Sequence, residues 1–314
     1  MALKVIGHIN PDSDTVCSPI AYAWYLTHKK DAEAEAFIAG PLNKETAFIL
    51  NHFGLPTPKL LEHFTHSDEL IIMDTNNPDE LLPGFEKAKI RCIIDHHKLV
   101  GGIQTEEPLM IAMEPIACTA TIAWNIMKRE GHHDIPKNIA GIMLCAILSD
   151  TLTFTSPTTT IIDKKAAEEL ADLCGEDIDS LAEKMFAAKS DLTGMTAHDI
   201  LTVDSKVFEF GGKKVRLSVL ETTKPENALH MLPDLQNEMS TMKDSEKLDY
   251  AFFFVVDILN TQAHLIVTTE EERLIAQEAF EGPFEEDTLL LPGVVSRKKQ
   301  IIPALEPVIA GATS

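Results

Sequence analysis

Short apolar runs that end in polar loops alternate with stretches of helical periodicity through the first half of the chain. The apolar runs predict strands at residues 3–8, 70–74 and 109–114, and two more that end near residues 40 and 95. The intervening periodicity predicts helices at residues 16–30 and 45–53 and a short helix after Pro78. Strands that alternate with helices in this way are typical of a mostly parallel sheet with right-handed crossovers.

The pattern becomes helical after residue 114, with helices predicted at residues 119–130, 139–149, 164–173 and 178–188. Residues 189–194 break this periodicity and are interpreted as a linker. Beyond the linker, Gly211-Gly212 is a hairpin signal between apolar runs. The second half is predicted to contain strands at residues 206–210, 214–220, 250–257, 264–268 and 288–291, with helices at residues 227–242 and 271–280.

These patterns predict an α/β protein of two domains. Residues 1–188 form a Rossmann-like domain with a parallel sheet, residues 189–194 the linker, and residues 195–314 a smaller mixed α/β domain. The chain of 314 residues, 45% of them hydrophobic and 24% charged, is long enough for each domain to bury its own core.

No stretch approaches the roughly 18 apolar residues that a membrane span needs. The N-terminus runs into a strand without a cleavable leader. We therefore expect a cytoplasmic protein with no membrane partner.

The five cysteines are widely spaced and form no Cys-x-x-Cys pair, which favours buried free thiols in a reducing compartment over a structural zinc site. The formal net charge of −22 argues against a nucleic-acid partner, because neutralising phosphates requires an excess of Lys and Arg. A small anionic substrate remains compatible with this charge, since bound cations and a local basic cluster can reverse the field at a site.

Histidine and aspartate residues fall where apolar runs end: His8, Asp12, Asp14, Asp74, Asp95, His96, His97 and Asp150. In a parallel sheet, ligands bind at the carboxyl ends of the strands, and carboxylates together with imidazoles suit divalent cations. Asp74 ends a run of four apolar residues, where a carboxylate needs a partner or a metal. Asp14 could instead cap the helix predicted to begin near Val16. Taken together, these residues favour a site for several cations and a hydrolytic reaction.

One dense basic run, Ser296-Arg297-Lys298-Lys299-Gln300, follows an apolar strand in the second domain. Such runs are usually solvated surface patches. Arg and Lys at this position could also hold phosphate oxygens, Arg as a bidentate fork and Lys as a point charge. Lys206 is a weaker candidate for the same task.

The motifs Gly7-His8-Ile9-Asn10-Pro11-Asp12-Ser13-Asp14, Met73-Asp74, Asp95-His96-His97 and Ser149-Asp150-Thr151 resemble, in this order and spacing, those of the DHH phosphoesterase superfamily. The run from Ser296 to Gln300 narrows the resemblance to the manganese-dependent, family II inorganic pyrophosphatases. The resemblance covers essentially the whole chain.

The resemblance implies that His8, Asp12 and Asp74 hold one metal and that Asp14, Asp74, His96 and Asp150 hold a second, with Asp74 as the bridge. It also implies that His97 faces the substrate and that Lys206, Ser296, Arg297 and Lys298 bind its phosphates. Asp95 would orient the cluster without binding metal. The implied cofactors are two Mn²⁺ per subunit, with Co²⁺ as an alternative, and Mg²⁺ bound with the substrate. A homodimer formed through an edge strand of the first domain is implied as well.

The activity implied is hydrolysis of pyrophosphate to two phosphates by a metal-bridged hydroxide, at a dinuclear site between the two domains. Two adjacent cations lower the pKa of a shared water from about 15.7 toward neutrality and clamp the attacked phosphate. Basic side chains then neutralise the leaving phosphate.

Two other classes of function compete with this interpretation. The first is another phosphoesterase of the superfamily, either a short-chain exopolyphosphatase or a phosphodiesterase of short RNAs or cyclic dinucleotides. The phosphodiesterases carry a Gly-Gly-His element in the second domain, where this chain has Ser296–Gln300 instead. The second class is a metal-binding module without catalysis, which the intact set of ligand residues disfavours.

Overall fold

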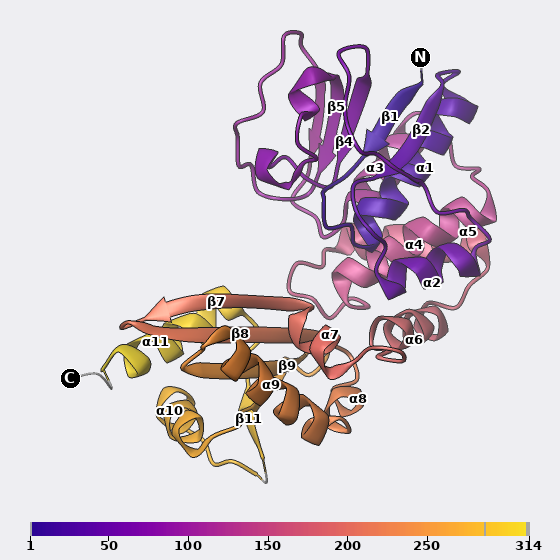
Figure 1. Cartoon of the computed structure of the whole chain (residues 1–314). Helices are drawn as coiled ribbons and strands as arrows, with labels where there is room; N and C mark the ends of the chain where they lie inside the picture. Colours follow the sequence, from indigo (N-terminus) through magenta and orange to yellow (C-terminus); the bar gives the residue numbers. More distant parts are fainter. Residues whose placement is uncertain (1, 286, 312–314) are drawn as a thin grey trace. The chain divides into compact units, whose positions relative to one another are not determined.

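The computed structural model describes residues 2–285 and 287–311, which form two compact units (Figure 1). One unit ends at Ala188 and the other begins at Lys189. Each unit has its own sheet, and each hydrophobic core cluster draws its residues from one unit. The α/β fold class predicted from the sequence is confirmed.

The first unit is built on six parallel strands in the order β3-β2-β1-β4-β5-β6. The strands are β1 (Leu3–Ile6), β2 (Ala34–Ile38), β3 (Lys59–Leu60), β4 (Glu69–Met73), β5 (Lys89–Asp95) and β6 (Met110–Met113). Short 3₁₀ turns, Pro78–Glu80 and Phe85–Lys87, connect β4 to β5. Because neighbouring residues of a strand face opposite sides, Val5 packs into one core cluster and Ile6 into another, so both faces of the sheet are covered.

The helices of the first unit are α1 (Ser13–Lys29), α2 (Lys44–His52), α3 (Thr119–Arg129), α4 (Lys137–Thr151), α5 (Ile161–Cys174) and α6 (Ile178–Lys189). Helix α4 is buried on all sides, since every residue from 139 to 149 is buried. A helix that is apolar all round belongs in the centre of a core. Its buried position fixes the C-terminal end of α4, where Asp150 lies.

The second unit has a five-stranded mixed sheet in the order β11-β10-β9-β8-β7. Its strands are β7 (Asp204–Phe210), β8 (Lys213–Thr222), β9 (Tyr250–Asp257), β10 (Gln262–Ile266) and β11 (Thr288–Pro292). Only β8 and β9 pair in parallel. The predicted hairpin at Gly211-Gly212 joins β7 to β8, and both glycines have positive φ.

The remaining helices are α7 (Ala197–Thr202), α8 (Glu226–Leu229), α9 (Leu232–Glu246), α10 (Glu270–Phe280), a π-helical turn (Arg297–Ile301) and α11 (Ile302–Gly311). Helix α9 packs on one face of the sheet, whereas α10 and α11 pack on the other. No helix among residues 2–285 and 287–311 is both long and apolar enough to cross a membrane.

Three of the predicted element boundaries are corrected by the structure. The single helix predicted at 227–242 is wrong, because the structure has α8 and α9, and Pro233 in the first turn of α9 favours a new start there. Lys189, predicted to open the linker, is the last residue of α6. The first long helix begins at Ser13 rather than Val16, so Asp14 lies in its first turn and not in a loop.

Candidate metal centre

The acidic and histidine residues identified in the first domain lie at the carboxyl ends of β1, β4 and β5. His8 lies two residues beyond β1, Asp74 directly follows β4, and Asp95 is the last residue of β5. In the sheet, β2 and β3 lie on one side of the β1–β4 pair, and β5 and β6 lie on the other. Open parallel sheets bind ligands at such a point, where the strand order reverses. The start of α1 adds Asp12 and Asp14, and the last turn of α4 adds Asp150.

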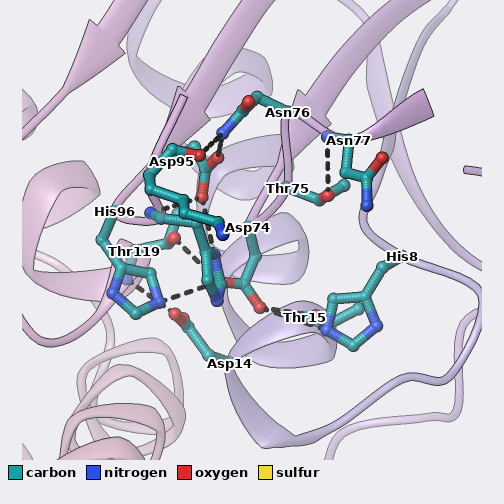
Figure 2. Close-up of polar contacts among 12 residues, drawn as sticks. His8, Asp14, Thr15, Asp74, Thr75, Asn76, Asn77, Asp95, His96 and Thr119 are labelled. Carbon is teal, nitrogen blue, oxygen red and sulfur yellow. Dashed lines mark hydrogen bonds and ion pairs between the residues drawn. The ribbon is translucent and has the colours of Figure 1, made fainter. Parts of the chain in front are cut away.

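The potential ligand atoms form three groups: His8 with Asp12 and Asp74, Asp14 with His96 and Asp150, and Asp74 with His96 and His97. Within each group the ligand atoms lie within 4.8 Å of one another. The carboxylate of Asp74 lies between two of the imidazoles (Figure 2). Its Oδ2 is 3.6 Å from His8 Nε2, and its Oδ1 is 3.3 Å from His96 Nε2. Asp74 is therefore placed to join one group to another.

Asp74 is held from both sides by threonine hydroxyls. Thr15 Oγ1 donates to Oδ2 at 2.5 Å, and Thr119 Oγ1 donates to Oδ1 at 3.0 Å. The residue is 1% exposed, and its φ of +64° lies in the left-handed region that non-glycine residues seldom adopt. Because the backbone must turn sharply at the end of β4, this conformation directs the carboxylate into the site.

Asp14 is tied to the start of helix α3. The backbone amides of Thr119 and Ala120 donate to its Oδ2 and Oδ1 at 2.6 and 3.1 Å, and Ser18 Oγ also donates to it. Amides at a helix N-terminus are good donors to a carboxylate, so this contact fixes the Asp14 side chain beside His96 and Asp150.

The crowding of acidic groups shifts their pKa values. Burial, followed by the charge of Asp14, raises the pKa of Asp74 to about 7. Burial and the charges of Asp14 and Asp12 also raise the pKa of Asp150 well above its usual range. Burial would lower the pKa of His96, but its hydrogen bond to Asp74 and the charge of Asp14 raise it to about 9. Each of these shifts reflects a site that favours added positive charge.

The donor set fits divalent cations. Asp150 Oδ2 is buried and accepts no hydrogen bond from any residue that the structure describes. A buried carboxylate oxygen is costly without a partner, and a cation would satisfy it. Mixed imidazole and carboxylate ligands suit Mn²⁺, Co²⁺ and Zn²⁺. Asp12, Asp74, His96, His97, Ala117, Asp150 and Thr158 line a hollow of about 140 Å³ at this place.

His97 is oriented by Asp95, which is 0% exposed. Asp95 Oδ1 accepts hydrogen bonds from the backbone amide and the Nδ1 of His97, at 3.0 and 2.9 Å. Its Oδ2 accepts one from Asn76 Nδ2 at 2.5 Å. The His97 side chain is 52% exposed and borders both the metal-site hollow and a neighbouring hollow of about 520 Å³. With Nδ1 engaged, its Nε2 remains available to a ligand.

Arg297, from the basic run of the second unit, lies at the start of β7. Arg297 Nη2 lies 2.8 Å from Asp204 Oδ1, and its Nη1 donates to the Asp204 carbonyl at 3.2 Å. Ser296 caps the π-helical turn by accepting from the Lys299 amide. Lys206 and Lys298 are exposed, and neither forms an ion pair with any residue in the described ranges. Lys206 and Lys298 thus present unpaired ammonium groups.

Thr15, Thr119 and Asn76 were not identified from the sequence as members of the site. Their contacts with Asp74 and Asp95 join segments distant in the chain. The sequence feature that could have indicated the role of Thr15 is its position directly after the Asp12-Ser13-Asp14 motif.

Two family models match successive parts of the chain. Residues 3–147 match the DHH family, N-terminal domain, and residues 183–308 match the DHHA2 domain. A Bacillus subtilis protein named manganese-dependent inorganic pyrophosphatase is 37% identical over 309 residues, which is 98% of this chain and 99% of the relative.

Two solved structures are also similar. A Methanococcus jannaschii protein assigned to the family II inorganic pyrophosphatases matches with a TM-score of 0.68 and 31% identity, over 98% of this chain and 99% of that one. An exopolyphosphatase-related protein from Bacteroides fragilis matches with a TM-score of 0.51 and 16% identity, over 99% of this chain and 92% of that one. The second likeness concerns the fold alone.

Proposed function

Since the chain belongs to the manganese-dependent, family II inorganic pyrophosphatases of the DHH superfamily, we propose that it hydrolyses inorganic pyrophosphate to two phosphates. The observation in the structure that carries this proposal is the carboxylate of Asp74, which lies between His8 and His96 with a different oxygen toward each. A bridging carboxylate is what a two-metal hydrolase needs.

The proposed metal content is two Mn²⁺ per subunit. His8, Asp12 and Asp74 would hold one, and Asp14, Asp74, His96 and Asp150 the other. The first set is one of the donor groups described above, and the second adds Asp74 to another of them. Co²⁺ could replace Mn²⁺, and Mg²⁺ would enter with the substrate. When bound, these cations supply a water of low pKa and neutralise phosphate charge.

The residues of the chain itself bind and orient the substrate. The hydrogen bond to Asp95 raises the pKa of His97 above its usual value, which favours the imidazolium. Its Nε2–H would then donate to a phosphate oxygen. We assign Lys206, Ser296, Arg297 and Lys298 to the phosphates as well, because charge-assisted hydrogen bonds stabilise the charge that develops on the leaving group.

The same proposal includes a cytoplasmic homodimer. All five cysteines are free thiols, and four of them are buried, as suits a reducing compartment. The edge strand β6 exposes Met110 by 46% and Ile111 by 55%, and an exposed apolar edge strand is a natural pairing surface. Light scattering should give the dimer mass for the native chain and the monomer mass for Ile111→Lys; a native monomer would contradict this part of the proposal.

The activity is tested by measuring phosphate release from pyrophosphate, tripolyphosphate and a dinucleotide side by side. The Mn²⁺-loaded protein with Mg²⁺ should turn over pyrophosphate fastest, lose activity on chelation and regain it with Mn²⁺. Preference for tripolyphosphate or the dinucleotide would assign the chain another phosphoesterase activity. No turnover of any of the three substrates would refute catalysis.

A further inference from the structure

Glu45 is a buried carboxylate that the metal centre described above does not include. It lies in the first turn of α2 and is 1% exposed. Glutamate is almost never fully buried unless it is paired, so its position requires an explanation. The N-terminal turn of a helix favours its negative charge.

One oxygen of Glu45 joins three helices. Ser13 Oγ donates to Oε2 at 3.0 Å from the start of α1, and Ser149 Oγ donates to the same oxygen at 2.9 Å from the last turn of α4. Ser13 is 0% exposed and Ser149 is 8% exposed, so both hydrogen bonds are shielded from water. Helices α1, α2 and α4 lie side by side in the first unit (Figure 1).

Both serines adjoin candidate metal ligands. Ser13 lies between Asp12 and Asp14, and Ser149 directly precedes Asp150. Movement of either serine would therefore move a carboxylate of the centre. Asp14 and Asp150 share one donor group, although they belong to segments far apart in the chain. Through its two hydrogen bonds, the Glu45 side chain connects these two segments.

The Glu45 carboxyl group also acts electrostatically on a side chain near the centre. Together with Asp14 it raises the pKa of the buried Cys17 thiol, whose pKa burial already raises, and Cys17 lies one turn after Asp14 in α1. Glu45 and Asp14 thus act on the same thiol, so Glu45 lies close to a carboxylate that would bind metal. An additional carboxylate favours cation binding and opposes loss of the cation.

We propose that Glu45 is a positioning residue of the metal centre, which holds Ser13 and Ser149 so that Asp12, Asp14 and Asp150 present their oxygens to Mn²⁺. This inference rests on the proposed metal-dependent hydrolysis. What it adds is a residue that determines the affinity for Mn²⁺. It predicts that loss of Glu45 weakens Mn²⁺ binding without disturbing substrate binding, because no phosphate ligand belongs to this network.

The test is calorimetric titration of the whole metal-free protein with Mn²⁺, alongside steady-state kinetics at saturating Mn²⁺. Glu45→Ala should raise the Mn²⁺ dissociation constant by about 10- to 100-fold, the usual effect of removing a residue that orients ligands. KM for magnesium pyrophosphate should stay within about two-fold of the native value, because the groups assigned to phosphate remain. Ser149→Ala should show a smaller loss of Mn²⁺ affinity that does not add to that of Glu45→Ala.

Glu45→Gln keeps the volume but accepts the two serine hydrogen bonds less strongly than a carboxylate does, so it decides the question if Glu45→Ala does not fold. It should still weaken Mn²⁺ binding several-fold. The matched control is Glu272→Gln in the second unit, another buried glutamate in the first turn of a helix, whose loss should lower Tm and leave Mn²⁺ affinity unchanged.

A lowered Tm with native Mn²⁺ affinity in Glu45→Gln, or in Glu45→Ala where it folds, would overturn the proposal and leave Glu45 a structural residue. Failure of the proposed function gives a different result, since the native protein would then bind Mn²⁺ but release no phosphate from pyrophosphate.

Discussion

At the scale of single residues, Asp74 combines burial with a backbone conformation that is unfavourable for a non-glycine residue. It is buried, has a strained φ, accepts hydrogen bonds from two threonines and lies beside two imidazoles. Such strain persists only where the surroundings fully determine the conformation, and it is often found at functional sites.

Asp74→Ala should abolish pyrophosphate hydrolysis and lower the Mn²⁺ content, because it removes an oxygen from both proposed metal positions. Metal content is measured by elemental analysis after gel filtration. The control is Asp68→Ala, which removes another buried carboxylate of the same unit, one paired with Lys4 at 2.9 Å, and should retain the metal. Full metal occupancy in Asp74→Ala would contradict the bridging role.

Mn²⁺ affinity should rise with pH between about 6 and 9. The cation must displace protons from Asp74, whose pKa is about 7, and from His96, whose pKa is about 9. Both pKa values are raised, so the protonated forms are favoured at low pH and compete with the metal there. Calorimetry at pH 6 and pH 8, in buffers of different ionisation enthalpy, measures both the affinity and the proton release. Equal affinity at the two pH values, without proton release, would show that these groups do not bind the cation.

Lys298→Ala should raise KM for pyrophosphate about 10-fold or more, because a hydrogen bond to a charged group contributes about 1.5–3 kcal/mol. The Mn²⁺ content should be unchanged. Lys299→Ala is the matched control, since Lys299 is the adjacent exposed lysine and was not assigned to phosphate. An equal effect of both variants would indicate a general loss of charge rather than a specific contact.

At the scale of elements, the segment after α4 is unusual because Leu152, Thr153 and Phe154 all have positive φ, from +46° to +68°. A left-handed conformation costs about 1–2 kcal/mol for each non-glycine residue. This turn directly follows Asp150-Thr151 at the end of α4. Thr153 Oγ1 is also buried without a hydrogen-bond partner among the described residues.

Thr153→Gly should therefore raise the free energy of unfolding by about 1 kcal/mol, since glycine adopts positive φ readily and the buried hydroxyl is removed. Ala171→Gly in the interior of α5 should instead lower it by about 1 kcal/mol. Urea denaturation of the two variants gives both values. Destabilisation of similar size in both would mean that the turn is not strained.

Elements with strong local signals were the ones that could be predicted. The strands before His8, Asp74 and Asp95 are nearly continuous apolar runs, and a parallel sheet brings their ends together. Helix α11 was missed because Pro303 and Pro307 lie within it, and β3 because two residues carry no periodicity. The threonine contacts to Asp74 could not be predicted, because they depend on how α1 and α3 pack and not on any local pattern.

At the scale of the whole molecule, both tryptophans of the chain, Trp24 and Trp124, lie in the first unit. All the proposed metal ligands lie there too. Because each core cluster belongs to one unit, the two units should unfold separately. Tryptophan fluorescence then reports only the unit that carries the proposed metal ligands, whereas far-UV circular dichroism reports both.

Mn²⁺ at 100 times its dissociation constant should raise the midpoint seen by fluorescence by roughly 5–10 °C, equivalent to about 2.7 kcal/mol of stabilisation. The circular dichroism curve should gain a second transition that does not move. A single transition that shifts equally in both signals would show that the units unfold together.

The proposed ligands are also spread along the sequence, from His8 near the start of the first unit to Asp150 near its end. A bound ion would link these segments as a cross-link does, and closing so long a loop in an unfolded chain is entropically unfavourable. Metal capture should thus be a late event in folding, possible only after α4 has been synthesised and packed. Nascent chains that do not yet include α4 would therefore hold no metal, and loading would mark the packing of α4 into the first unit.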